Sequence, residues 1–391
     1  MRKGHRKEKG EHSTGARMTD TRLGLRKGHR KEKREHRPER PVGPPSTPKV
    51  RLPPRVKPAP VPSETLAPEP GQWLWTCRAG FEPQLFEELA WARARPAMLG
   101  AALVASGAQP ARVPTFARMG FPVSHVVSTP EEVVEVLPGE PTLVQVWSPD
   151  TDAGNARAGR CTVWKGTVEV LRSRRGEVDP ANGWAARETG AWLGQVCLLG
   201  EGVAAVGQVR AREAVSLSPG GRMRMKRTQD APSRAAMKLD EALEWYGISP
   251  GRGEHCVDLG SAPGGWTRRL VERGARVLSI DPGQLAPDLQ KHPKVRHITL
   301  SAFDFAPEEP VDWLFCDMAW RPLEVAQLLG KWGRRRWALH VVSNIKLPMK
   351  DKLPVVAAVR GILEGAGWRH VAIRQLYHDR DEVTLTARMA G

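Results

Sequence analysis

The stretch VDLGSAPGGWT, residues 257–267, joins an apolar run to a glycine-rich turn and then to a segment with helical character. A strand, a glycine-rich turn and a helix in this order are typical of nucleotide-binding α/β proteins. The stretch lacks both the G-x-G-x-x-G pattern of dinucleotide-binding turns and the G-x-x-x-x-G-K-S/T pattern of phosphate loops. Because the turn also contains no Lys or Arg, it predicts a ligand that offers no phosphate at this position.

Around this stretch, strand-like and helix-like segments alternate from residue 234 to the end of the chain. Such alternation predicts a parallel sheet with helices on both faces. We therefore expect an α/β domain over residues 221–391, doubly wound around a mostly parallel seven-stranded sheet, with its site at the carboxyl ends of the strands. The predicted strands are HCVDLG (255–260), RVLSID (276–281), VRHITL (295–300), VDWLFCD (311–317), WALHVVSNIKL (337–347), HVAIRQLY (370–377) and EVTLTARM (382–389).

Two acids favour a nucleoside ligand. Asp258 precedes the turn, and Asp281 closes the next strand 23 residues later. An acid about 20 residues on, at a strand end, typically binds ribose hydroxyls. S-adenosylmethionine has a ribose, an adenine and a cationic sulfonium but no phosphate, so it matches both the acids and the turn. The alternative is a turn that only connects two elements.

Four further polar residues stand where a site is expected. Asp317 ends the strand WLFCD, Lys346 ends the apolar run VVSNIK, and Glu382 begins the last strand. Lys238 lies on a helix that enters the domain from upstream. Each residue alone is unremarkable in such a position, but their order, Lys-Asp-Lys-Glu, suits the methylation of a ribose 2′-hydroxyl.

Methylation of a ribose 2′-hydroxyl explains chemically why two lysines and two acids would occur together. A 2′-hydroxyl is a weak acid and a poor nucleophile, so it needs a base and alignment with the methyl–sulfur bond. A lysine whose ammonium group is desolvated beside another cation has a lowered pKa, so its neutral amine can accept a proton, and neighbouring carboxylates orient the two nitrogens. The reaction relieves the charge on sulfur, so no metal is required.

Three other residues near these strand ends are expected to take no part. Cys316 could act as a nucleophile, but side chains alternate along a strand, so it should face a buried layer away from Asp317. Lys350 and Lys352 follow Lys346 and are expected to be solvated.

The segments DLGSAPGGWT, CDM, NIKLPMK and QLYHDRDEVT, preceded by DAPSRAAMKLDEA, resemble FtsJ-type RNA 2′-O-ribose methyltransferases. Over about residues 225–391 they more closely resemble the ribosomal RNA large subunit methyltransferase M family. The resemblance implies a Rossmann-like class I methyltransferase domain. It also implies S-adenosylmethionine-dependent methylation of the 2′-hydroxyl of a cytidine in the peptidyl-transferase region of 23S rRNA.

The resemblance also implies roles for individual residues. Lys346 becomes the proton acceptor, and Lys238, Asp317 and Glu382 complete a catalytic tetrad. Asp317 additionally lies beside the methyl end of the cofactor. Ser301 stands where the family has an acid for the adenine, and Asp304 follows three residues later. The remaining cofactor contacts are Ser233, Ala262, Pro263, Gly264, Gly265 and Asp281.

Residues 71–220 read as a smaller α+β domain without a glycine fingerprint. TCRAGFEPQLFEEL resembles the opening of the same family, which implies a ferredoxin-like and THUMP-type RNA-binding region. The expected strands are WLWTC (73–77), PTFARMGFPVSHVVS (114–128), TLVQVWSP (142–149) and GVAAVGQVR (202–210). The expected helices begin at GFEPQLFEEL (80–89) and cover PEEVVEVL (130–137), while WAARETGAWLGQVCLLG (184–200) reads as a helix leading into a strand.

Residues 1–70 are expected to form a disordered basic and proline-rich arm. The net charge of the chain is +17, and residues 1–60 alone contain 19 Lys/Arg against 6 Asp/Glu. RKGHRKEKGEH at 2–12 returns as RKGHRKEKREH at 26–36, and residues 38–70 hold 12 prolines. A basic segment of this kind attracts polyanions, above all nucleic acid, and buries too little apolar surface to fold.

The remaining features exclude other classes of protein. Five widely spaced cysteines form no C-x-x-C pair, which argues against a zinc site or a disulfide framework and favours the reducing cytoplasm. No apolar run is long enough to span a membrane. We expect a cytoplasmic monomer that acts on 23S rRNA, either naked or in an early assembly intermediate. The alternatives are another structured RNA as substrate, or a non-catalytic RNA-binding protein with a decayed methyltransferase fold.

Overall fold

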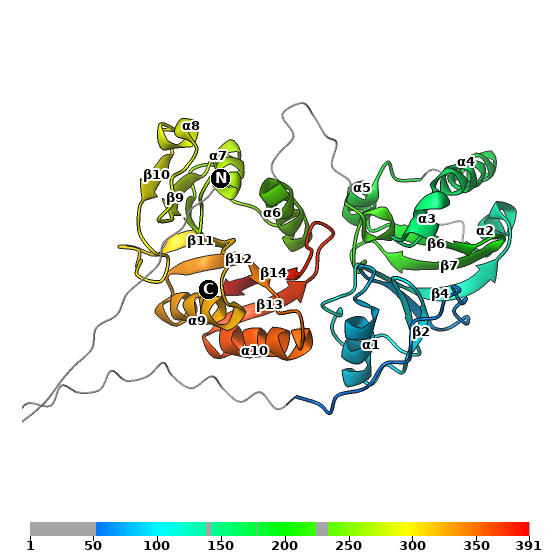
Figure 1. Cartoon of the computed structure of the whole chain (residues 1–391). Coiled ribbons are helices and arrows are strands. Elements are labelled where there is room, and N and C mark those ends of the chain that lie inside the picture. Colours follow the sequence, from blue (N-terminus) through cyan, green and yellow to red (C-terminus); the bar gives the residue numbers. More distant parts are fainter. Residues whose placement is uncertain (1–51, 138–141, 178, 224–233, 391) are drawn as a thin grey trace, which may run out of the picture. The chain divides into compact units, whose positions relative to one another are not determined.

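The computed structural model describes residues 52–137, 142–177, 179–223 and 234–390. Within these residues the strands form two seven-stranded sheets (Figure 1). The first sheet comes from the N-terminal half of the described chain and the second from the C-terminal half. The fold class predicted from the sequence is confirmed.

The C-terminal sheet has the strand order β10-β9-β8-β11-β12-β14-β13. Neighbouring strands pair in parallel from β10 to β12, and β14 is antiparallel to both of its neighbours. All seven predicted strands of this domain are present. Their bounds are β8 (His255–Leu259), β9 (Arg276–Ile280), β10 (Val295–Ile298), β11 (Val311–Cys316), β12 (Ala338–Lys346), β13 (Trp368–Arg374) and β14 (Glu382–Met389).

Helices cover both faces of this sheet (Figure 1). On one face, α6 (Arg234–Tyr246) and α7 (Gly265–Glu272) pack apolar side chains such as Leu239 and Trp266 against the strands. On the other face, α9 (Pro322–Arg335) and α10 (Lys352–Gly365) do the same with Leu329 and Leu363. The short α8 (Pro287–Gln290) follows β9. This layering leaves the carboxyl ends of the parallel strands free to form a site.

The N-terminal sheet has the order β2-β3-β1-β4-β7-β6-β5 and is antiparallel except for the pair β5 and β6. β4 is long enough to pair with β1 along its first half and with β7 along its second half, with a bulge near His125. The bounds are β1 (Trp73–Thr76), β2 (Pro96–Gly100), β3 (Leu103–Ser106), β4 (Met119–Val127), β5 (Thr142–Trp147), β6 (Trp192–Gly200) and β7 (Val203–Arg210).

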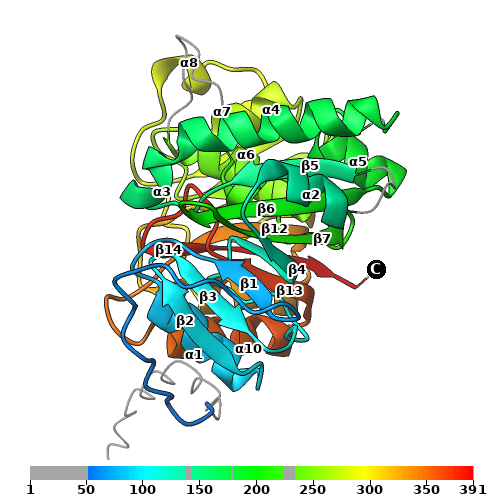
Figure 2. The same ribbon diagram turned by 90° about the vertical axis from the view of Figure 1, so that its right-hand side faces the viewer.

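The helices of this half are α1 (Glu82–Trp91), α2 (Pro130–Val136), α3 (Asp152–Ala156), α4 (Ala158–Arg174) and α5 (Gly183–Thr189), followed by the 3-10 turn Pro219–Gly221. α2 and α4 cover β5 and β6 through a shared apolar cluster that includes Trp164 and Val168, and Figure 2 shows the length of α4. The sequence predicted α1, α2 and α5 but neither α4 nor the strands β2 and β3.

Residues 1–51 of the predicted arm lie outside the described residues. Residues 52–70 form no helix or strand, but they contact the folded chain. The backbone N–H of Leu66 donates to the carbonyl of Leu99 at 2.7 Å, and the indole N–H of Trp91 donates to the carbonyl of Pro54 at 3.3 Å. In the described part of the chain, no helix is long and apolar enough to cross a membrane.

Candidate active site and adjoining cavity

The four residues predicted to form the tetrad meet at the carboxyl edge of the C-terminal sheet. Lys346 is the last residue of β12, and antiparallel pairing sets it opposite Glu382, the first residue of β14. Asp317 directly follows β11, the parallel neighbour of β12. The side chains of Lys346, Lys238 and Glu382 all act electrostatically on Asp317.

Lys238 reaches this edge because α6 packs on the sheet. Leu239, Ala242 and Leu243 recur at helical spacing and are buried against the strands, which fixes the helix. The amino group of Lys238 then forms an ion pair with Glu382, and both side chains are largely buried. By contrast, Lys346 is exposed at the strand tip, so its amino group is accessible from solvent.

Burial raises the pKa of the Asp317 carboxyl above its ordinary value. Three features lower this pKa and so oppose the effect of burial: the charge of Lys238, a hydrogen bond from Asn344, and the charge of Lys346. The charge of Glu382 raises the pKa further. The Asn344 side-chain amide donates to Asp317 Oδ1 at 3.2 Å. The charges of all three other tetrad residues therefore act on the Asp317 carboxyl.

Behind Asp317 lies a buried polar chain that the sequence prediction missed. Thr384 Oγ1 lies 3.0 Å from Asn344 Oδ1 and 2.9 Å from Asp379 Oδ2, and all three residues are almost fully buried. Burial raises the pKa of Asp379 well above its ordinary value. The hydroxyl of Thr384 can donate to Asp379 or to Asn344, and Asn344 donates to Asp317, so these side chains connect Asp379 to the Asp317 carboxylate. A polar residue inside an apolar strand, as in VVSNIKL, is the signal that could have found Asn344.

A cavity of about 710 Å³ adjoins Asp317 and is lined by the glycine-rich turn and by Ala235 and Ala236 of α6. Two glycines shape the turn. Gly260 has φ +73°, and a Cβ there would lie 2.3 Å from Met318 Cγ. Gly264 precedes α7 with φ +114°, and a Cβ there would lie 2.2 Å from Leu289 Cδ1. No other residue type can hold this backbone without displacing its neighbours.

Asp258 is the buried acid of this cavity. Its Oδ2 accepts a hydrogen bond of 2.7 Å from Thr267 Oγ1, whereas its Oδ1 is buried with no partner among the described residues. Burial raises the pKa of Asp258 to about 7; the Thr267 bond opposes this shift and Asp317 adds to it. The hydroxyl of Ser261 in the same lining is also buried and has no partner in the part of the chain that the structure describes. The lining of the cavity contains three carboxylates and two arginines, so it favours a ligand that carries positive charge.

The predicted cofactor residues divide into three groups. Ala262, Pro263, Gly264, Gly265 and Asp317 line the cavity. Asp281 closes β9 and holds the turn, because its oxygens accept from the backbone N–H of Ala262 at 3.1 Å and of Gly283 at 2.7 Å.

The third group lies apart from the lining. Ser301 is half-buried and its hydroxyl accepts from the backbone N–H of Phe303 at 3.3 Å. Asp304 is exposed. Neither is among the lining residues described for this cavity. Ser233 lies outside the described residues.

Two expectations about neighbouring side chains have opposite outcomes. Cys316 is fully buried, as predicted, and burial raises the pKa of its thiol to about 12. The prediction for Lys352 was wrong, because this residue is buried: its amino group donates to the carbonyl of Pro348 at 2.8 Å and lies over the ring of Phe81. Lys350 is exposed as expected. Among the described residues, no group of three His, Cys, Asp or Glu side chains could hold a metal ion.

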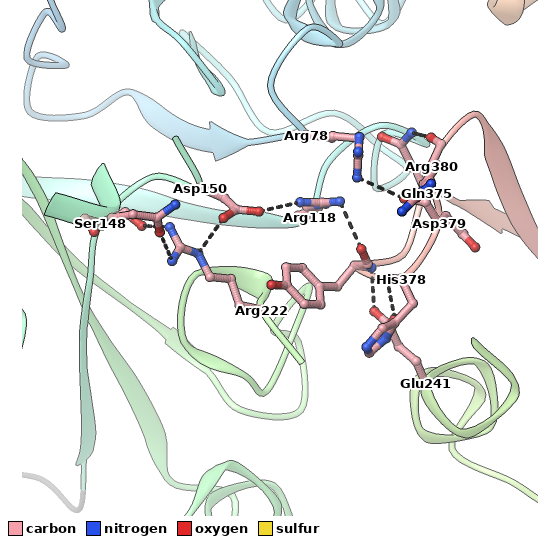
Figure 3. A network of polar contacts seen from close by, with 12 residues as sticks. Arg78, Arg118, Ser148, Asp150, Arg222, Glu241, Gln375, His378, Asp379 and Arg380 are labelled. Atoms are coloured by element: carbon pink, nitrogen blue, oxygen red, sulfur yellow. Dashed lines mark hydrogen bonds and ion pairs between the residues drawn. The ribbon is translucent and has the colours of Figure 1, made fainter. Parts of the chain in front are cut away.

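The loop that leads into Glu382 is held by polar contacts from both halves of the described chain (Figure 3). Arg118 donates to the carbonyl of Tyr377 at 3.2 Å and to Asp150 Oδ2 at 3.1 Å. Glu241 of α6 accepts from the backbone N–H groups of Tyr377 at 2.6 Å and His378 at 2.9 Å. The loop therefore links the N-terminal half to α6, which carries Lys238, and to the strand that begins with Glu382.

The chain is similar to known methyltransferases. A family model described as FtsJ-like methyltransferase matches residues 231–331. The ribosomal RNA large subunit methyltransferase M of Halorhodospira halophila is 36% identical over 343 residues, covering 81% of this chain and 96% of that protein. The protein of the same name from Alkalilimnicola ehrlichii is 34% identical over 352 residues, covering 81% of this chain and 94% of that protein.

Among solved structures, a Methanococcus jannaschii fibrillarin pre-rRNA processing protein is 16% identical, with a TM-score of 0.34, covering 51% of this chain and 83% of that chain. That likeness is too weak to carry an argument. The two relatives, by contrast, extend across both sheets and match nearly their whole length. The family resemblance found in the sequence is thus confirmed, and the chain belongs to the ribosomal RNA large subunit methyltransferase M family.

Proposed function

We propose that this protein methylates the 2′-hydroxyl of a cytidine in 23S rRNA, with S-adenosylmethionine as the methyl donor and Lys346 as the base. The observation that carries the proposal is the position of Asp317. Its carboxylate lines the cavity beside the glycine-rich turn and also lies among Lys238, Lys346 and Glu382. A methyl donor in that cavity and a hydroxyl at the tetrad would therefore meet at one residue. The family membership and the names of the relatives support RNA as the substrate.

The cavity fits the donor chemically. S-adenosylmethionine supplies, when bound, a methyl group activated by a sulfonium. The carboxylate of Asp258 belongs to the cavity lining, and its negative charge attracts the ammonium group of the methionine part. Backbone along Ala262–Gly265 lines the same cavity, and Asp281 retains lone pairs for ribose hydroxyls beside the two N–H groups that it accepts. Ser301 and Ser233 remain our proposed contacts at the two ends of the ligand.

The tetrad residues would divide the work. Lys346 is exposed at the strand tip in the ligand-free protein; once bound RNA desolvates it, its neutral amine takes the proton of the 2′-hydroxyl as the oxygen attacks. Glu382 holds Lys238 in a buried ion pair, and the resulting ammonium orients the substrate oxygen beside Asp317. Asn344 fixes one oxygen of Asp317, so the carboxylate keeps its direction during the transfer. The main contribution of these residues is alignment of the reacting atoms.

We further propose a division of the chain. Residues 221–391 would carry catalysis, residues 71–220 would form a ferredoxin-like and THUMP-type RNA-binding region, and the basic residues of 1–70 would attract the polyanionic substrate. In this proposal the enzyme works as a cytoplasmic monomer on 23S rRNA that is naked or in an early assembly intermediate. Similarity to the relatives over 81% of the chain supports the inclusion of the N-terminal half in the functional unit.

The test is transfer of labelled methyl groups from S-adenosylmethionine to protein-free 23S rRNA, with ribose methylation mapped by nucleotide. We expect a single 2′-O-methylcytidine from the wild type and none from Lys346→Ala, while cofactor binding measured by calorimetry stays the same. Lys350→Ala is the matched control, because it removes an exposed lysine four residues away and should leave the reaction intact.

Three other outcomes would change the proposal. Transfer to a different nucleotide or only to another RNA would move the substrate and keep the chemistry. Equal rates for Lys346→Ala and the wild type would remove Lys346 as the base. Absence of both transfer and cofactor binding in the wild type would favour a non-catalytic RNA-binding protein.

A further inference from the structure

A second cavity, of about 530 Å³, is lined by another part of α6 and by segments from both halves of the described chain. Its α6 side chains are Glu241, Glu244 and Trp245, whereas the cavity beside the glycine-rich turn uses Ala235 and Ala236. The remaining charged lining is dominated by arginine. Six arginines line this second cavity against three glutamates: Arg112, Arg118, Arg187, Arg212, Arg360 and Arg374 against Glu241, Glu244 and Glu364.

Within the described residues, two of the six arginines form ion pairs, Arg112 with Glu364 at 3.6 Å and Arg118 with Asp150 at 3.1 Å. Arg212 donates to the main-chain carbonyls of Arg187 and Glu188, each at 3.1 Å. Arg374 donates to three main-chain carbonyls between 2.6 and 3.2 Å, and Arg360 donates to the carbonyl of Val371. Carbonyl acceptors orient a guanidinium group but do not cancel its charge. Within the described residues, Arg187, Arg212, Arg360 and Arg374 have no ion pair with a carboxylate.

Burial of three of these cations is unfavourable. It lowers the pKa of Arg374 to about 10 and also lowers the pKa values of Arg118 and Arg360; Arg78 and Arg112 add to these two shifts, whereas Asp150 and Glu364 oppose them. The Nε–H groups of Arg118 and Arg374 are buried with no acceptor among the described residues. A cavity of this charge is stabilised by an anion that enters from solvent.

One wall of the cavity offers an aromatic surface. Trp184 of α5 is 38% exposed. Its indole N–H donates to Glu244 Oε1 at 3.1 Å, which fixes the ring, and the guanidinium group of Arg187 lies 5.6 Å from the ring centroid. A fixed, partly exposed indole beside arginines is a platform on which a nucleobase can stack while its phosphate meets the cations.

The cavity also adjoins the loop that leads to the tetrad. Gln375, Leu376 and Tyr377 belong to its lining, and Glu382 follows a few residues later in the same connection. Glu241, another lining residue, accepts from the N–H groups of that loop and lies one helical turn from Lys238. A strand held in the cavity would therefore run close to the proposed reaction centre.

We propose that this second cavity binds a single-stranded segment of the substrate RNA, with a phosphodiester held by Arg187 and Arg212 and a base stacked on Trp184. The inference rests on the proposed function, because it takes RNA as the substrate and adds the site that grips it outside the catalytic tetrad. The chemistry recognised is that of a nucleotide. The strand, rather than a free nucleotide, is favoured because the lining is long and its cations are spread over several segments.

The first experiment measures binding of a fluorescein-labelled, single-stranded oligoribonucleotide of about 12 nucleotides by anisotropy at several salt concentrations. Arg187→Ala and Arg212→Ala should each weaken binding about tenfold or more, and the double variant should reduce the log–log salt slope by about 0.7, as expected for one lost phosphate contact. Arg174→Ala removes an exposed arginine of α4 outside the lining and is the matched control. Equal losses for the control and for the cavity variants would overturn the assignment.

The second experiment separates stacking from charge. Trp184→Leu should weaken binding by a factor of about 5 to 150 without changing the salt slope, and Trp184→Phe should restore most of the affinity. Unchanged affinity in Trp184→Leu would remove the stacked base from the proposal. Because Trp184 and Arg212 are exposed, Trp184→Leu, Trp184→Phe and Arg212→Ala should keep the unfolding midpoint of the wild type.

Competition identifies the source of the nucleotide. Cytidine monophosphate should compete with the oligoribonucleotide only weakly; tight binding of the monophosphate would overturn the assignment to an RNA strand.

In methyl transfer, the cavity variants should raise KM for RNA and leave kcat and cofactor affinity unchanged. If the wild type transfers methyl groups and the variants keep its KM, the cavity proposal fails and the proposed function stands. If the wild type transfers no methyl groups but the variants lose RNA binding, the proposed function fails and the assignment of the cavity to RNA stands.

Discussion

The titration of Asp258 predicts how cofactor affinity depends on pH. In the ligand-free protein, burial raises the pKa of this carboxyl to about 7. Below that pH the group is protonated and neutral, and it cannot pair with the ammonium group of S-adenosylmethionine. Binding of the cation therefore requires loss of this proton, so affinity should rise with pH up to about 7 and then level off.

The magnitude follows from the same pKa. With a pKa of about 7 in the free protein and one below about 4 in the complex, the dissociation constant should be about 25-fold larger at roughly pH 5.5 than at roughly pH 7.5. At roughly pH 6.5, about 0.75 proton should leave the protein for each ligand bound. The ligand's own α-amino group, with a pKa near 7.7–8.0, stays protonated over most of this window.

The assay is isothermal titration calorimetry in pairs of buffers with different ionisation enthalpies, which counts the released protons directly. Asp258→Asn should bind at least about tenfold more weakly near neutral pH and lose the pH dependence, because no proton remains to be released. Glu309→Gln, at an exposed carboxylate outside the cavity lining, should behave as the wild type. An affinity that changes less than about threefold across the window, with no proton release, would refute the assignment of Asp258 to the cation.

The raised pKa of Asp258 also affects the free energy of unfolding of the protein. A carboxyl whose folded pKa lies above its unfolded value of about 3.9 stabilises the protein below that value, and this contribution is lost as pH rises through the folded pKa. For Asp258 the loss between about pH 4 and pH 7 amounts to about 4 kcal/mol. Asp258→Asn should therefore raise the free energy of unfolding of the ligand-free protein above neutral pH while it weakens cofactor binding.

Three further predictions concern other parts of the chain. Asn344→Leu should lower kcat without changing cofactor affinity and should cost about 1–3 kcal/mol in urea unfolding, because Asp317 and Thr384 lose a buried partner; an unchanged kcat would contradict the polar chain behind Asp317. Arg374→Met should lower the free energy of unfolding by at least about 2 kcal/mol, since it leaves three buried carbonyls unpaired; an equal or higher stability would mean that relief of the buried charge dominates. Removal of residues 1–51 should flatten the salt dependence of RNA binding and leave the affinity for cofactor intact, and an unchanged slope would exclude the arm from RNA contact.

The domain around the glycine-rich turn was predictable because its information is local. The strands β8, β9, β11 and β12 are short, mainly apolar runs bounded by turn residues, and the parallel arrangement follows from β-α alternation. Once the sheet is parallel, residues at the ends of neighbouring strands must share an edge. The nearness of Asp317, Lys346 and Glu382 was therefore available from the sequence.

The elements that the sequence prediction missed have weak local patterns. α4 contains Gly159, Gly166 and several β-branched residues, which favour helix poorly, and its buried face includes only a few side chains, among them Trp164 and Val168. β2 begins with Pro96, ends with Gly100 and forms a short hairpin with β3. Pairing with neighbouring strands and packing against α2 decide these segments, and neither contribution can be read from a short window.

Lys352 shows the same limit for a single side chain. A lysine next to Asp351 in a polar turn is ordinarily solvated, yet this one is covered because α10 packs its first turn against Phe81, a residue far away in the sequence. Burial depends on what the rest of the chain brings alongside, so exposure could not be judged from the neighbours in sequence.

By itself, the sequence determined the family, the doubly wound domain and the set of polar side chains that share its edge, because strand ends and glycine turns are encoded within a few residues. Only the tertiary structure decided which oxygen of Asp258 stays unpaired, that Asn344 supports Asp317, and that a cavity rich in arginine lies beside the loop leading to Glu382. Each of these depends on contacts between segments separated by tens to hundreds of residues. Such contacts exist only after the two sheets and α6 have packed, since burial and missing partners are properties of the folded chain as a whole.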